Sequence, residues 1–177
     1  MSANFADAAF TENALLFGSA FPYGADFRRA AFANDVQFDS ALFARKALFS
    51  RALFRKSAYF TNCAFLEDVD FSESTFGDNT YFGYRASFSG AAFAAGANFS
   101  DSIFMDVADF SGEGRALETI LEPETIKEGA ASLSVSANKL AALRGVSPLA
   151  RRSVGRFSAW NAIFIGPADF SNRDIVN

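Results

Sequence analysis

The side chains of this sequence that could do chemistry are serines, carboxylates and one cysteine, because the chain contains no histidine. A serine nucleophile needs a neighbouring base, and histidine is the commonest acid–base group and metal ligand. The serines recur directly after a phenylalanine, as at Ser72, Ser89, Ser100 and Ser111. That recurrence indicates a structural position rather than a catalytic centre.

The carboxylates and the cysteine lead to the same prediction. Asp101, Asp106 and Asp109 could hold a hard cation only if they met at one place, and the repeat described below puts them on different sides. The single cysteine, Cys63, allows neither an internal disulfide nor a thiolate cluster, and we expect it to be buried. The sequence therefore predicts a protein without metal, cofactor or enzymatic activity.

Phenylalanine accounts for 23 of the 177 residues, and most of these phenylalanines are five or six residues apart. From Phe27 to Phe76 the two spacings alternate, with a small residue two positions before each Phe. A helix would spread such residues around its axis, whereas in a short strand positions i−2 and i point to the same side. Each unit therefore predicts one short strand and a corner, and successive units wind into an all-β solenoid.

Units such as Ala25-Asp26-Phe27 and Ala97-Asn98-Phe99 resemble the pentapeptide-repeat family. The resemblance covers residues 3–111 and implies a right-handed, four-sided β-helix with positions i−2 and i inside. Because every second unit has a sixth residue, four sides would take 22 residues, which gives about five coils. Two successive six-residue steps around Phe82 interrupt the alternation, so we expect the long and short sides to exchange places there.

The charged residues favour a 22-residue coil, because opposite charges 22 positions apart would be neighbours on adjacent coils. The expected pairs are Asp7–Arg29, Arg45–Glu67, Lys46–Asp68, Arg51–Glu73 and Lys56–Asp78. We interpret the basic run at residues 28–56 as neutralising these acids. Together with the formal net charge of −4, this argues against direct nucleic-acid binding.

The chain divides into three parts. Residues 1–111 form the expected β-helix, residues 112–156 a helical insertion or cap, and residues 157–177 a return to the repeat. Apolar residues in the insertion recur at helical spacing, which predicts amphipathic helices whose apolar faces would cover an end or a side of the solenoid: Leu117, Ile120, Leu121, Leu140 and Leu143. The returning units would either continue the same solenoid or begin a stack completed by another chain.

The ends of such a solenoid would expose strand edges and Phe rings, so we predict a homodimer or a higher stack through the coil ends. No apolar run approaches the length of a membrane span, and no secretion signal stands at the N-terminus. A reducing, cytoplasmic location is therefore expected.

Outward positions supply the candidate partner-binding residues. We expect a column spaced by 22 residues and a belt around one coil: Gln37, Tyr59, Tyr81 and Ile103 in the column, and Leu42, Leu48 and Leu53 with Tyr59 in the belt. Exposed apolar groups in such arrangements indicate a partner site, unless the insertion covers them.

The sequence thus favours a non-enzymatic protein-interaction or structural scaffold. The resemblance implies an alternative, because some pentapeptide-repeat proteins look like duplex DNA and bind DNA gyrase or topoisomerase IV, inhibiting the enzyme or protecting it from drugs. The acidic balance and the residues Asp101, Asp106 and Asp109 favour this DNA mimicry. The paired charges argue against it, since mimicry needs a continuous acidic surface.

Overall fold

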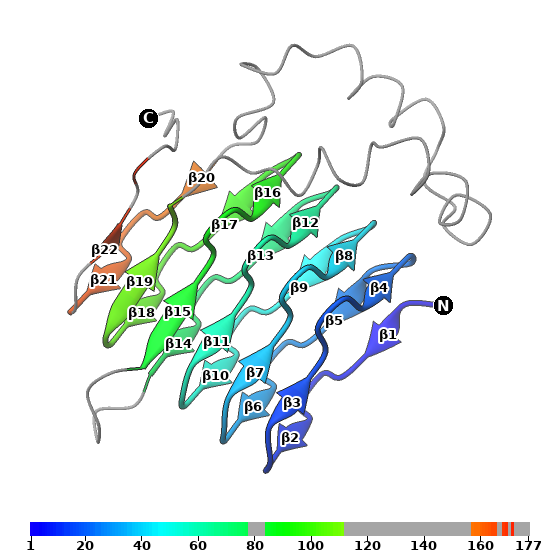
Figure 1. The fold of residues 1–177 in the computed structure, drawn as a ribbon, viewed down its shortest axis with the longest axis horizontal. Coiled ribbons are helices and arrows are strands. Elements are labelled where there is room, and N and C mark those ends of the chain that lie inside the picture. The colour runs from blue at the N-terminus through cyan, green and yellow to red at the C-terminus, as the bar shows by residue number, and fades with distance from the viewer. Residues whose placement is uncertain (78–83, 112–156, 166–167, 170, 172–177) are drawn as a thin grey trace.

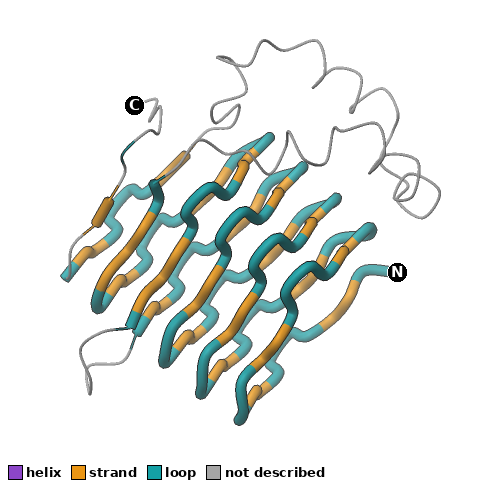
Figure 2. The backbone as a smooth tube through the Cα atoms, in the orientation of Figure 1, coloured by secondary structure: helices purple, strands orange, loops and turns teal. Residues whose placement is uncertain are grey.

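The computed structural model describes residues 1–77, 84–111, 157–165, 168–169 and 171. These residues form strands of two or three residues joined by tight corners (Figure 1). Each strand pairs in parallel with a strand of the next coil, and the pairs build four sheets that enclose the interior (Figure 2). We call the sheets faces A to D, in the order in which the chain visits them. The expected four-sided, all-β solenoid is confirmed.

Faces A and B each contain six strands. Face A consists of β1 (Ala3–Asn4), β5 (Ala25–Asp26), β9 (Ala47–Leu48), β13 (Val69–Asp70), β17 (Ala97–Asn98) and β20 (Phe157–Ser158). Face B consists of β2 (Ala9–Phe10), β6 (Ala31–Phe32), β10 (Leu53–Phe54), β14 (Thr75–Phe76), β18 (Ile103–Phe104) and β21 (Ile163–Phe164).

Face C has six strands and face D has four. Face C consists of β3 (Ala14–Leu15), β7 (Val36–Gln37), β11 (Ala58–Tyr59), β15 (Arg85–Ser87), β19 (Val107–Asp109) and β22 (Ala168–Asp169). Face D consists of β4 (Ala20–Phe21), β8 (Leu42–Phe43), β12 (Ala64–Phe65) and β16 (Ala92–Phe93). Strands β20, β21 and β22 therefore extend the sheets of this same solenoid rather than starting a separate stack.

Strand register gives the length of each coil. A regular coil takes 22 residues, as where Ala47 pairs with Val69. The coil that contains the link between β14 and β15 takes 28 residues, so Val69 pairs with Ala97. The coil that contains the link between β19 and β20 takes 60 residues, so Ala97 pairs with Phe157. After both links the chain re-enters the same sheets.

The expected exchange of long and short sides near Phe82 is wrong. Residues 78–83, which include Phe82, lie outside the described residues, and they separate β14 from β15 at one corner. Beyond them the 22-residue register resumes in its original phase, with Arg85 paired to Val107. Inter-strand hydrogen bonds fix the position of each coil, and extra residues at a corner cost only the entropy of closing a longer loop.

Phenylalanine rings fill the interior in four columns, one behind each face. Rings of adjacent coils stack almost parallel, with centroids 4.6 to 5.3 Å apart, because the spacing of neighbouring strands sets their separation. The small residue two positions earlier lies inside as well, as with Ala58 and Phe60, both 0% exposed. The expected inward positions i−2 and i are confirmed.

One unit of the first coil departs from the pattern. Phe17 is 65% exposed, and Leu16 packs against the core instead. Leu16 preserves the six-residue step from Phe10, whereas Phe17 would require a seventh residue. The strand spacing therefore selects the residue at the correct position even where the larger ring is next to it.

Candidate protein-interaction surface

Outward side chains stand in columns because the strands of each face are in register. On face A the column between the small residue and the Phe is Asn4, Asp26, Leu48, Asp70, Asn98 and Ser158, and on face B it is Ala9, Ala31, Leu53, Thr75, Ile103 and Ile163. On face C it is Leu15, Gln37, Tyr59, Ser87, Asp109 and Asp169, and on face D it is Ala20, Leu42, Ala64 and Ala92.

The first two members of the expected column, Gln37 and Tyr59, pair on face C, but the column does not continue to Ile103. Tyr59 lies on face C and pairs with Ser87 of the next coil, 28 positions ahead, because extra residues separate β14 from β15. Ile103 lies on face B and pairs with Thr75. Tyr81 lies outside the described residues. Gln37 and Tyr59 are therefore on face C, whereas Ile103 is on face B.

The expected belt is distributed over all four faces. Leu42, Leu48, Leu53 and Tyr59 take the same outward place in β8, β9, β10 and β11, which belong to faces D, A, B and C. Each of the four side chains is half-buried. A partner touching all of them would have to encircle the solenoid, so they do not form one patch.

Face B presents a strip of mostly apolar residues drawn from two adjacent columns. The first column contributes four residues, and the residues just after Phe104 and Phe164 contribute the rest. We call these residues the face-B strip: Leu53, Thr75, Ile103, Met105, Ile163 and Ile165. Exposure is highest in the last coil, where Ile163 is 53% and Ile165 is 64% exposed. Exposed apolar groups on one flat face are typical of a protein-binding surface.

Gly77, one coil below Met105, leaves room for the Met105 side chain. Its φ is +93°, a conformation that favours glycine, and a Cβ there would lie 2.9 Å from the Met105 Cβ. Any other residue at position 77 would therefore collide with the Met105 side chain unless one of the two moved.

Trp160, at the corner between faces A and B in the same coil as Ile163, is 74% exposed. Tryptophan is over-represented among side chains that anchor protein interfaces. Counting by 22 misses Trp160, Ile163 and Ile165 because their coil is offset by 60 residues from the preceding one. The available signal was the isoleucine on either side of Phe164.

The three aspartates considered for a metal or for mimicry lie in different places. Asp101, at the corner between faces A and B, accepts a hydrogen bond from Asn161 Nδ2 at 2.7 Å. Asp106 follows face B, and Asp109 lies on face C with its Oδ2 atom 4.0 Å from Arg85 Nη1. Within the described ranges, no three carboxylate or thiol groups gather closely enough to hold a metal ion.

The charge pairs across coils follow the sequence prediction in three cases. The confirmed pairs are Asp7–Arg29 at 2.6 Å, Arg45–Glu67 at 2.7 Å and Arg51–Glu73 at 2.9 Å. Arg29, Arg45 and Arg51 of the basic run at residues 28–56 are therefore matched by acids of neighbouring coils.

The other two expected pairs have different outcomes. Asp68 accepts a hydrogen bond from the Gly96 amide at 2.9 Å, rather than pairing with Lys46. The Lys56 Nζ atom donates to Asn34 Oδ1, and its expected partner Asp78 lies outside the described residues.

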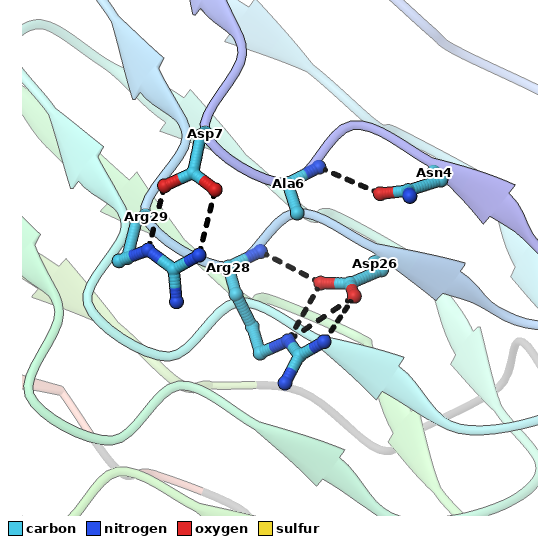
Figure 3. Close-up of polar contacts among 6 residues, drawn as sticks. All are labelled: Asn4, Ala6, Asp7, Asp26, Arg28 and Arg29. Carbon is cyan, nitrogen blue, oxygen red and sulfur yellow. Dashed lines mark hydrogen bonds and ion pairs between the residues drawn. The ribbon is translucent and has the colours of Figure 1, made fainter.

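Figure 3 shows how arginines neutralise carboxylates on the first two coils. The Arg29 guanidinium donates to both oxygens of Asp7 and lowers the pKa of that carboxyl group. Arg28 does the same for Asp26, whose Oδ1 atom also accepts the Arg28 backbone amide, and the pKa of Asp26 is lowered. Both carboxylates are therefore charged and matched at neutral pH.

Cys63 is buried in the inward small-residue position of face D. Its thiol donates to the Phe38 carbonyl oxygen at 2.9 Å, and burial raises the pKa of the thiol. Ser74 occupies the equivalent position on face B and donates to the Phe49 carbonyl at 2.7 Å. The thiol therefore acts as a packed donor and not as a nucleophile.

Comparison with known proteins supports the assignment of the repeat. The family described as "Pentapeptide repeats (9 copies)" matches residues 38–84. No curated protein and no solved structure matched the sequence. None of the described residues forms a helix with the length and apolar character needed to cross a membrane. The four-sided solenoid thus contains pentapeptide repeats at residues 38–84, with five- and six-residue units alternating around its faces.

Proposed function

We propose that this protein is a non-enzymatic scaffold that binds another protein through the face-B strip. The observation that carries the proposal is the exposure of Ile163 and Ile165 beside the half-buried Ile103 and Met105 on one flat sheet. Burying these side chains against a partner would contribute about 25 cal/mol for each Å² of apolar surface. Trp160, at the adjoining corner, would supply an aromatic anchor.

The rigid interior supports this function. Stacked rings such as Phe76 and Phe104, whose centroids are 4.6 Å apart, hold the strands of face B from within. A surface that is already ordered loses little conformational freedom on binding, which favours affinity. The solenoid therefore presents the strip in a fixed geometry.

The test compares interaction partners of the wild type with those of a double variant, Ile103→Asp and Ile163→Asp. Leu48→Asp on face A is the matched control, because it places the same charge at the same outward position. Partners are captured by chemical cross-linking in extracts of the source cells and counted by quantitative mass spectrometry. We expect at least one protein to be retained by the wild type and the control and lost by the double variant. Identical partner sets for all three proteins would contradict the proposal.

DNA mimicry directed at DNA gyrase or topoisomerase IV stays an alternative prediction. Mimicry needs a continuous acidic surface, whereas Asp7, Asp26, Glu67 and Glu73 are each paired with an arginine. The charge distribution therefore favours the scaffold. A gyrase supercoiling assay separates the two, because a mimic would inhibit or protect the enzyme at a small molar excess and a scaffold for another partner would do neither.

Assembly through the coil ends and the cytoplasmic location also stay predictions. In the described structure, strands β1 to β4 of the first coil are paired on one side only. Exposed Leu15, Phe17 and Tyr23 lie on that coil. Light scattering at tens of micromolar protein tests self-association, and a monomeric mass would count against it.

A further inference from the structure

The face-B strip is bordered by charged residues whose sign changes along the solenoid. Beside β10, Arg51 lies at the corner between faces A and B, and Lys56 lies at the corner between faces B and C. Two coils further on, beside β18, the same two places are taken by Asp101 and Asp106. Arg51 and Asp101 share the left-handed conformation of their corner, with φ of 61° and 58°. The borders of the strip are therefore basic at one end and acidic at the other.

Hydrogen bonds within the chain leave charge at both ends of the strip. At the acidic end, Asp101 accepts a hydrogen bond from a neutral asparagine amide at 2.7 Å. At the basic end, Arg51 pairs with Glu73 of the next coil, whereas Lys56 donates to a neutral asparagine oxygen. Arg55, directly after β10, is exposed and adds a further positive charge. A ligand on the strip would therefore meet cations near β10 and a carboxylate near β18.

The period of the strip fits an α-helix that lies along the solenoid axis. Outward residues of face B recur once per coil, about every 4.8 Å, and an α-helix advances about 5.4 Å per turn. From Leu53 to Ile163 the strip covers three coil steps. A three-turn helix would drift from these steps by only about 2 Å, whereas a strand, which repeats its side chains on one face about every 6.7 Å, would lose register within two steps. Apolar anchors at i, i+4 and i+7 of a helix therefore match this surface.

We infer that the partner binds the face-B strip through an amphipathic helix that carries acidic residues along one half and basic residues along the other. The acidic half lies over β10 and the basic half over β18, where opposite charges attract. Trp160, whose carbonyl oxygen accepts the Asp101 amide, exposes its ring at the acidic end of the strip. That ring favours the same arrangement, because lysine and arginine pack well on aromatic faces. The inference rests on the scaffold function proposed above and adds the shape and the charge of the partner.

Trp160 supplies the readout of the test, because it is the only tryptophan of the chain and is 74% exposed. The probes are two stapled, tryptophan-free helical peptides with the same composition and the same leucine stripe. One peptide has its glutamates and lysines in separate halves, and the other has them intermixed. In fluorescence titrations of the full chain, we expect the segregated peptide to shift the Trp160 emission to shorter wavelength and to bind about tenfold more tightly than the intermixed peptide. In 1 M salt this preference should fall below about twofold.

Variants of the chain show which residues cause the preference. Asp101→Asn combined with Asp106→Asn removes the acidic border, and should lower the preference for the segregated peptide to about threefold or less. Asp70→Asn is the matched control, because it removes a carboxylate on face A, away from the strip. The control should keep the preference of the wild type. Ile103→Asp combined with Ile163→Asp should abolish binding of both peptides.

Two outcomes would overturn the inference while the scaffold proposal survives. Equal affinities of the two peptides for the wild type would show that the charged borders do not select the partner. Binding of neither peptide, with cellular partners still lost from the Ile103→Asp and Ile163→Asp variant, would show that the strip receives a partner that is not such a helix. Failure of the scaffold proposal itself has a different signature, since the cross-linked partner sets would then be identical in that variant and the wild type.

Discussion

Faces A and D are built from the same unit but use their outward positions differently. Asp26 and Asp70 on face A accept the backbone amide two residues ahead, at 3.0 Å in both cases. Face D has only alanine, leucine and proline in its outward columns. Leu48 is half-buried among the polar residues of face A, whereas Leu66 on face D is 1% exposed. The inward residues therefore determine the fold, whereas the outward residues differ according to whether a face is exposed to water or buried.

The largest expected losses of stability come from substituting interior phenylalanines, and these losses should be similar behind faces A and D. Phe49→Ala behind face A and Phe65→Ala behind face D should each lower the free energy of unfolding by about 3–5 kcal/mol, because each removes a fully buried ring and leaves a cavity. The exposed Phe17→Ala is the control, and its effect should stay within about 0.5 kcal/mol. Urea unfolding followed by circular dichroism measures all three. A large difference between Phe49 and Phe65 would show that the two interiors are not equivalent.

A leucine-to-asparagine substitution at an outward position should lower stability on face D but not on face A. Leu66→Asn should destabilise by about 2–3 kcal/mol, because it buries an amide among apolar side chains. Leu48→Asn should be neutral or stabilise by about 0.5 kcal/mol, because an asparagine there can accept the Ser50 amide as Asn4 accepts the Ala6 amide. Thermal unfolding of the two variants measures the difference. Equal decreases in melting temperature for the two variants would show that the outward positions of faces A and D are in similar environments.

The polar column of face A should make stability depend on pH. The folded-state pKa of Asp26 is lowered by Arg28, so its contribution is present above the unfolded pKa of about 3.9 and is lost as pH falls through the folded value. Asp26→Asn keeps an acceptor for the Arg28 amide but removes the charge. The variant should melt below the wild type at pH 7, and this gap should shrink as pH falls below 4. A gap that is constant with pH would show that the charge is not responsible.

The smallest effect is expected at the corner between faces A and B. Glu73 and Arg51 are both in the left-handed backbone region and well exposed, although they form a pair at 2.9 Å. A double-mutant cycle with Glu73→Gln and Arg51→Gln should give a coupling of about 0.2–1 kcal/mol that weakens in 1 M salt. A coupling that persists in high salt would indicate a role other than surface charge pairing.

Much of the fold could be predicted from the spacing of phenylalanines. The stretch from Phe27 to Phe76 fixes which positions face inward, and the charge pairs Arg45–Glu67 and Arg51–Glu73 fix the length of a coil. Both signals are local or repeat at a constant interval, so they can be read from the sequence alone.

The binding surface could not be predicted to the same extent. Tyr59 pairs with Ser87, and Ile103 pairs with Ile163, because the chain leaves the repeat once between the two members of each pair. Sequence distance then no longer gives the coil to which a residue belongs, since hydrogen bonds between strands restore register after any number of added residues. The outward leucine and alanine columns of face D were visible in the sequence, but not their burial.

The return of the chain to the same register after residues 78–83 means that residues can be inserted or deleted without altering the neighbouring coils. Duplicating or deleting one full turn would alter the length of the rod by about 4.8 Å without disturbing the turns beyond it. A foreign peptide grafted in place of residues 78–83 would be displayed at a fixed height beside face B. Each corner therefore lies at a fixed position along the solenoid axis, and the number of coils sets the distance between any two corners.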